Sequence, residues 1–158
     1  MANSWSYVPN DKYKPTNEII EKLVDIVSKG GNYLLNIGPA PDGTFDDTAY
    51  ARLKEIGVWM RANGEAIYGT RNYAVFGEGN VRYTQSKDGK TQYVFFFDQP
   101  VDKVSLTKLS LDKNCKLNML GTKTALKWKQ AGDAVEVTVP ASTTKAGEHV
   151  WVMKVVRK

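Results

Sequence analysis

The sequence of 158 residues contains one cysteine, Cys115, and one histidine, His149. A single cysteine excludes an intrachain disulfide and a cysteine-rich metal site, and it leaves the redox compartment undetermined. A zinc centre with three protein ligands, or a Cys–His nucleophilic pair, would have to recruit carboxylates that no motif supplies. We therefore expect neither a metal site nor a cofactor.

Long hydrophobic runs are missing as well. No stretch approaches the roughly 20 apolar residues that span a bilayer, and Met1–Tyr7 lacks the basic region and apolar core of a secretory signal peptide. The sequence thus predicts a soluble chain with no membrane partner. It is also too short for a complete (β/α)8 barrel, which typically needs about 200 residues or more.

Charge is distributed unevenly along the chain, whose formal net charge is +5. Residues 1–72 hold 8 basic and 9 acidic side chains, a net of −1, whereas residues 73–158 hold 14 and 8, a net of +6. The basic half is rich in lysine spaced along strand-like segments, whereas nucleic-acid recognition favours arginine. We therefore interpret these lysines as a solvated strand face and expect no nucleic-acid partner. They are Lys103, Lys108, Lys113, Lys116, Lys123, Lys127 and Lys129.

The first half has the pattern of helix, buried strand and helix. Apolar residues at helical spacing predict a helix over 16–27, with Thr16 as its cap, and a second helix from a cap at Asp46 to about Ala62. Between them, the apolar run Asn32–Pro39 ends in Gly–Pro and predicts a buried strand of a parallel sheet. One such strand cannot form a sheet, so its partners must come from the rest of this chain, another chain or a larger parent.

The second half changes to a period of two. Short β-rich runs are predicted at 81–84, 91–97, 101–107, 116–121, 125–129, 134–139 and 150–156. The Asp88–Gly89 turn predicts a hairpin between the first two runs, and Gln130–Asp133 predicts another. About seven short strands fit a small antiparallel sandwich. The expected fold class is α+β in two parts, with residues 1–72 as a partial (β/α) barrel segment and 73–158 as a β-sandwich.

Four segments carry a more specific signal. They are Ser4–Tyr7 (SWSY), Leu23–Pro39 (LVDIVSKGGNYLLNIGP), Asp42–Gly43 and Asn63–Thr70 (NGEAIYGT). In this order and spacing they closely resemble the retaining α-L-fucosidases, glycoside hydrolases that release terminal L-fucose from glycans. The resemblance implies that residues 1–72 are the C-terminal part of the catalytic barrel, and that 73–158 are the sandwich that follows it. Family members are commonly secreted, periplasmic or lysosomal.

The resemblance also bears on the active site. Retaining hydrolysis needs two carboxyl groups about 5 Å apart, a nucleophile and an acid/base of raised pKa. In the family both precede the Ser-Trp-x-Tyr segment, so no catalytic residue is identified in this chain. Trp5 matches the aromatic residue that faces the C6 methyl of fucose, although a tryptophan packed in the core is an equal alternative. Asn36, near the carboxyl end of the expected strand, is a weaker substrate-binding candidate, since a structural hydrogen bond to the following loop is favoured over a substrate contact.

Two alternatives remain at this point. The sandwich could be a non-catalytic carbohydrate-binding module, with Trp128 between Lys127 and Lys129, or it could simply brace the barrel. We expect a fucosylated glycan as the substrate of the parent enzyme. The isolated chain is expected to be inactive unless copies rebuild a site, and to self-associate through exposed barrel edges.

Overall fold

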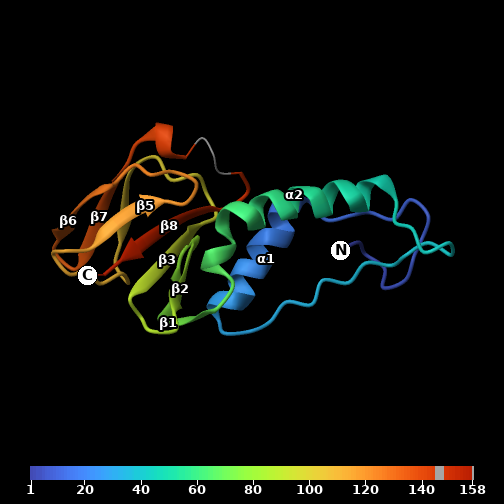
Figure 1. Cartoon of the computed structure of the whole chain (residues 1–158), viewed down its shortest axis with the longest axis horizontal. Coiled ribbons are helices and arrows are strands. Elements are labelled where there is room, and N and C mark those ends of the chain that lie inside the picture. The colour runs from blue at the N-terminus through green and yellow to red at the C-terminus, as the bar shows by residue number, and fades with distance from the viewer. Residues whose placement is uncertain (145–147, 158) are drawn as a thin grey trace.

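The computed structural model describes residues 1–144 and 148–157, which form two helices, two short 3-10 turns and eight strands (Figure 1). The helices are α1 (Thr16–Ser28) and α2 (Asp47–Asn63), and the 3-10 turns are η1 (Gly64–Ala66) and η2 (Ala141–Thr143). The strands are β1 (Thr70–Glu78), β2 (Val81–Ser86), β3 (Thr91–Phe96), β4 (Asp102–Leu106), β5 (Lys116–Met119), β6 (Lys127–Ala131), β7 (Ala134–Val139) and β8 (Trp151–Val156). Neither helix is long and apolar enough to cross a membrane.

Both expected helices are present, but only one has the predicted cap. Asp46 caps α2, because its Oδ1 accepts a hydrogen bond from the Ala49 amide at 2.8 Å. Thr16 was expected to cap α1, and this prediction is wrong: Pro15 occupies the cap position. The Thr16 hydroxyl instead donates to Glu55 of α2, so it joins the two helices.

The predicted buried strand at Asn32–Pro39 is also wrong in this chain. The segment is extended but pairs with no strand among residues 1–144 and 148–157, and its Leu34 side chain is 87% exposed. A parallel strand is held by hydrogen bonds to neighbours on both sides and is covered on both faces. The described residues provide neither a neighbouring strand nor the second cover.

The strands form the two antiparallel sheets of a sandwich. One has the order β1-β2-β3-β8-β5, and the other has the order β4-β7-β6. Both predicted hairpins are confirmed, as β2 pairs with β3 and β6 pairs with β7. Strand β1 was not among the predicted runs. Its register with β2 shifts between Asn72 and Gly77, and this irregularity conceals the period of two.

The five-stranded sheet is covered on both faces, which gives three layers (Figure 1). Val94 and Phe96 of β3 belong to the core shared with the three-stranded sheet. Tyr93 and Phe95, which alternate with them, pack with Ile20 and other side chains of α1 and α2 in a second core. The central strand is therefore apolar on both sides, and β2, β3 and β8 lie beneath the helices.

Polar contacts join the helices to the sheet at two points. The Trp59 indole of α2 is buried and donates to the Val150 carbonyl at 2.8 Å. The guanidinium of Arg82 contacts Asp25 of α1 at 2.7 Å and lies 5.0 Å from the ring centre of Phe97. Trp59 is a core residue, and Trp128 and Trp151 pack against the sandwich core.

Glu78, at the end of β1, connects the two sheets. Its carboxylate accepts hydrogen bonds from the Tyr83 hydroxyl, from the Thr107 amide at 3.1 Å and hydroxyl at 2.6 Å, and from the Lys108 amide at 3.2 Å. Burial alone would raise the pKa of Glu78, but these hydrogen bonds outweigh it and hold the pKa below the ordinary value of 4.5. The ionised form of Glu78 therefore stabilises the junction.

The substitution Glu78→Gln tests this junction. A carboxyl group whose pKa is lower in the folded state stabilises the fold above its unfolded pKa, and this contribution is lost as the pH falls through the folded pKa. Urea denaturation midpoints of the parent chain should therefore fall more steeply than those of the variant as the pH drops below about 5. At pH 7 the variant should be less stable by about 1–3 kcal/mol, because a charged acceptor is lost. Parallel pH profiles for the two proteins would contradict this role.

Candidate functional site

The two residues singled out from sequence lie next to each other. The side-chain amide of Asn36 donates to the Trp5 carbonyl at 2.8 Å, across 31 positions of sequence. The Trp5 side chain is 81% exposed, so it is not a core residue of this chain. Asn36 does make a structural hydrogen bond, but to the N-terminal segment rather than to the loop that follows it.

Hydrogen bonds from backbone groups hold the N-terminal segment in place. Asp11 accepts hydrogen bonds from the Ser4 amide at 2.9 Å and the Lys12 amide at 2.7 Å. The Ser4 hydrogen bond is the main reason why the pKa of Asp11 is lowered. The N-terminal amine of Met1 donates to the Asn36 carbonyl, which adds a second link to the extended segment. Together these bonds fix the backbone from which Trp5 projects.

Gly38 explains why the two segments approach so closely. A Cβ at Gly38 would lie 2.4 Å from the Tyr7 nitrogen and 2.5 Å from the Ser6 carbonyl carbon. Real Cβ atoms are not found at such distances, so any side chain there would push the segments apart. From sequence, Gly38–Pro39 indicates only the end of a strand, and nothing local to Gly38 predicts this close packing.

The extended segment alternates as a barrel strand does. Tyr33, Leu35 and Ile37 pack beside Ile19 of α1 and Ala49 of α2. Leu34, between the first two, is exposed, and a hollow of about 250 Å³ beside the segment is lined by residues 33–36 together with Trp5, Lys14 and Lys22. Helices therefore cover one side of the segment, while Leu34 stays exposed and the hollow lies beside the two candidate residues.

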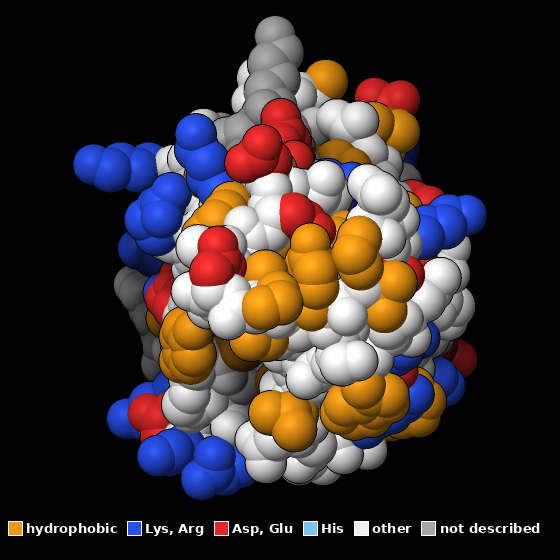
Figure 2. All heavy atoms as spheres, turned by 90° about the vertical axis from the view of Figure 1, so that its right-hand side faces the viewer, with side chains coloured by type: hydrophobic (Ala, Val, Ile, Leu, Met, Phe, Trp, Pro, Cys, Tyr) orange, Lys and Arg blue, Asp and Glu red, His pale blue; other side chains and the backbone are white. Residues whose placement is uncertain are grey.

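The same end of the molecule has exposed hydrophobic side chains. The N-terminal segment and the residues between α1 and α2 form the end that lies at the right of Figure 1, and Figure 2 shows hydrophobic side chains gathered over it. Trp5, Val8 and Leu34 are exposed there by 81%, 43% and 87%. A group of apolar side chains of this kind is typical of a surface that another part of a protein covers.

Most carboxyl groups of residues 1–72 have structural partners. Asp25 pairs with Arg82 and Lys29, Asp42 accepts from Thr44, and Glu65 pairs with Lys154 at 2.7 Å. Wherever the structure shifts a carboxyl pKa, the shift is downward, as for Asp25, where the hydrogen bonds from Lys29 and Arg82 outweigh burial. A glycosidase acid/base needs a raised pKa. Within the described ranges, no cluster of three or more His, Cys, Asp or Glu side chains forms a metal site.

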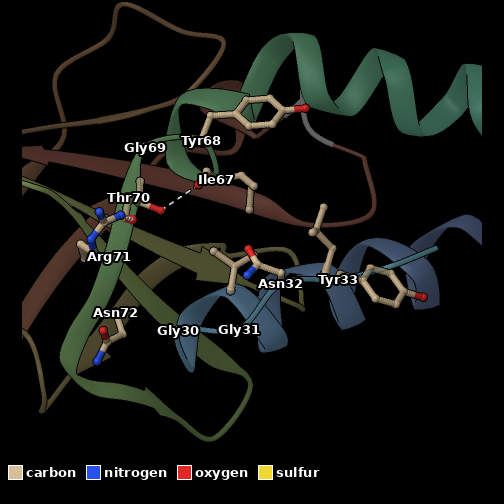
Figure 3. Close-up of a pocket in the computed structure, with 12 residues that line it drawn as sticks. Gly30, Gly31, Asn32, Tyr33, Ile67, Tyr68, Gly69, Thr70, Arg71 and Asn72 are labelled. Atoms are coloured by element: carbon tan, nitrogen blue, oxygen red, sulfur yellow. Dashed lines mark hydrogen bonds between the residues drawn. The ribbon is translucent and has the colours of Figure 1, made fainter.

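A larger hollow, of about 530 Å³, lies elsewhere (Figure 3). Asn32 and Tyr33 line it on one side, and the turn from Ile67 to Thr70 lines it on the other, where the Thr70 hydroxyl donates to the Ile67 carbonyl at 2.8 Å. It sits at the beginning of the extended segment, whereas barrel enzymes place their sites at the carboxyl ends of strands. Position therefore favours the hollow beside Trp5 and Asn36 over this larger one.

An extended segment that is covered by helices on one face only, and followed by an antiparallel sandwich, defines the class: the end of an α/β barrel enzyme joined to a β-sandwich. Comparison with known proteins gives the family. The Alpha-L-fucosidase family model matches residues 1–65, and the Alpha-L-fucosidase C-terminal domain model matches residues 76–156. The chain belongs to the α-L-fucosidase family and corresponds to the C-terminal portion of such an enzyme.

Individual relatives agree. Tissue α-L-fucosidase of Rattus norvegicus is 39% identical over 148 residues, which cover 89% of this chain and 32% of the relative. The Thermotoga maritima α-fucosidase in complex with fucose superposes with a TM-score of 0.86 at 31% identity, covering 97% of this chain and 37% of that one. A Bacteroides thetaiotaomicron α-L-fucosidase trapped as a covalent intermediate gives 0.81 at 27% identity, covering 97% and 35%. The chain thus spans about a third of the length of the relatives it matches.

Proposed function

We propose that this chain supplies the C-terminal portion of a retaining α-L-fucosidase that releases terminal L-fucose from glycans. The observation that carries the proposal is the open face of residues 33–38, with Trp5 fixed beside Asn36 at the carboxyl end of that segment. The Thermotoga relative that binds fucose and the Bacteroides relative trapped as a covalent intermediate support this substrate and the retaining course. Residues 1–72 are then the end of the barrel, and 73–158 are the sandwich.

Trp5 is proposed to contact the sugar. Fucose has an apolar methyl group and an apolar C–H face, which an indole can cover while hydroxyl groups are bound by other residues. The exposed ring and the fixed backbone of Trp5 suit this role, because the ring is available and its position is set by Asn36 and Asp11. Asn36 is proposed as a neighbouring contact, with its main effect exerted through the position of Trp5.

The catalytic carboxylates are proposed to come from the remainder of the enzyme, the two thirds that this chain does not match. The carboxyl groups described above are held in ion pairs, turns and caps, which leaves them no place in a dyad. In this arrangement the sandwich braces the barrel, because its five-stranded sheet provides the surface on which α1 and α2 pack. The isolated chain is then inactive.

A full-length chimera tests this proposal. The C-terminal third of the rat tissue enzyme would be replaced by residues 1–158 and assayed with a chromogenic α-L-fucoside. We expect turnover by the chimera and none by the isolated chain. In the chimera, Trp5→Ala should lower kcat/KM about 10- to 100-fold, mainly through KM, because an apolar contact of about 1.5–3 kcal/mol is lost.

Trp128→Phe in the same chimera is the matched control, since it changes a tryptophan of the sandwich and should leave kcat/KM unchanged. A chimera that unfolds cooperatively but shows no turnover would contradict the proposal. Turnover by the isolated chain that a single carboxylate substitution abolishes would contradict the location of the catalytic pair.

The isolated chain is also proposed to self-associate through the exposed end formed by Trp5, Val8 and Leu34. Burying such side chains between copies is favourable by about 25 cal/mol per Å² of apolar area. Light scattering should therefore give a mass that rises with concentration above that of a 17.6 kDa monomer, and Leu34→Asp should reduce this rise. A strictly monomeric chain at all concentrations would overturn the idea.

A further inference from the structure

The outward face of the three-stranded sheet carries a compact set of polar side chains. Along β4, β7 and β6, alternate residues point into the sandwich core, among them Val104, Val135 and Val137. The residues between them point outward and form what we call the lysine face. It consists of Lys103, Ser105, Lys127, Lys129, Glu136 and Thr138.

Strand register arranges the lysine face in two rows. Lys103 of β4 and Lys127 of β6 both lie directly opposite Thr138 of β7. In the next row, Ser105 and Lys129 both lie opposite Glu136. Since neighbouring strands are about 4.8 Å apart, the backbones of Lys103 and Lys127 are separated by about 10 Å, with the Thr138 hydroxyl between them.

Only the row that contains Glu136 has an acidic side chain to pair with its lysine. Lys129 pairs with Glu136 at 3.0 Å. Lys103 and Lys127 form no ion pair with any of residues 1–144 or 148–157. Two ammonium groups on either side of one hydroxyl thus point at the same space, a donor set that suits a bound sulfate or carboxylate group.

A shallow hollow of about 240 Å³ lies over this row. Trp128 lines it together with the three lysines, Glu136 and Thr138. The Trp128 indole donates to the Cys115 carbonyl at 3.3 Å and packs against the sandwich core, which holds its position. Trp128 lies opposite Val137 of β7, so its ring is on the core side of β6, and the outward surface here is formed by the lysines, Glu136 and Thr138.

We propose that the lysine face binds an anionic polysaccharide, with a sulfate or carboxylate group held at Thr138 between Lys103 and Lys127. Lysine serves here as a point charge, and the face contains no arginine for bidentate phosphate contacts. In Figure 1 β6 and β7 lie at the end of the molecule opposite the N-terminal segment, so this inference does not rest on the proposed fucosidase function.

Binding of the 158-residue chain to immobilised dextran sulfate, carboxymethyl dextran and neutral dextran tests the proposal. We expect binding to one or both anionic polymers and none to neutral dextran. Lys103→Gln combined with Lys127→Gln should weaken binding about tenfold and reduce the salt dependence by about two ions. Thr138→Val, which leaves the charge unchanged, should weaken binding a few-fold.

The control is Lys113→Gln combined with Lys123→Gln, which removes the same charge from two exposed lysines in loops outside the three-stranded sheet and should change binding less than twofold. Thermal unfolding of all variants should stay near that of the parent chain, because the changed side chains are exposed. Equal losses in both double variants would overturn the proposal, as would binding to neutral dextran, tighter binding to duplex DNA than to either anionic dextran, or no binding at all.

Discussion

The fold depends on one constraint: the central strands of the five-stranded sheet are covered on both faces. Val94 and Met153 pack toward the second sheet, while Tyr93, Phe95 and Val152 pack toward the helices. An uncovered face here would expose a row of large apolar side chains, at a cost of about 25 cal/mol per Å². The two helices therefore serve as the second cover of the sheet, in addition to their place in a barrel.

Because the sheet needs this second cover, α1 and α2 pack firmly against the sandwich. The N-terminal segment and the extended segment at 33–38 do not touch that core and leave apolar side chains exposed. Trp59 and Asp25 attach the helices to Val150 and Arg82. The extended segment at 33–38 has only the helices on one side, and Leu34 is exposed beside the hollow that Asn36 lines. The part of the chain nearest the proposed substrate site is thus the part that lacks neighbouring strands and leaves an apolar side chain exposed. This packing supports the proposed role of the sandwich as a brace for the barrel.

Local sequence signals predicted much of this structure. Helical spacing located both helices, Asp46 was a recognisable cap, and the Asp88–Gly89 turn fixed the β2–β3 hairpin. These features depend on neighbouring residues, so they can be inferred from sequence. The motifs also placed the chain in its family and led to the Trp5 and Asn36 pair.

Features that depend on distant partners could not be predicted. Thr16 matched a cap motif, yet its hydroxyl is used by Glu55, 39 positions away. Asn32–Pro39 has the composition of a buried strand, but a strand also needs hydrogen-bonded neighbours, and these are absent from the described residues. Strand β1 was concealed by a register shift, and the close approach at Gly38 depends on Ser6 and Tyr7. Sheet order and the second core follow from tertiary packing, which periodicity does not encode.

Native-state hydrogen exchange tests the central claim that the helices and the sandwich form one unit and that residues 33–38 lack a partner. The account predicts that amides of α1, α2, β3 and β8 exchange only through global unfolding, with similar free energies, while amides of residues 33–38 exchange much faster at concentrations where the chain is monomeric. Slow exchange at 33–38 matching that of β3, or helices that open independently of the sheet, would contradict it.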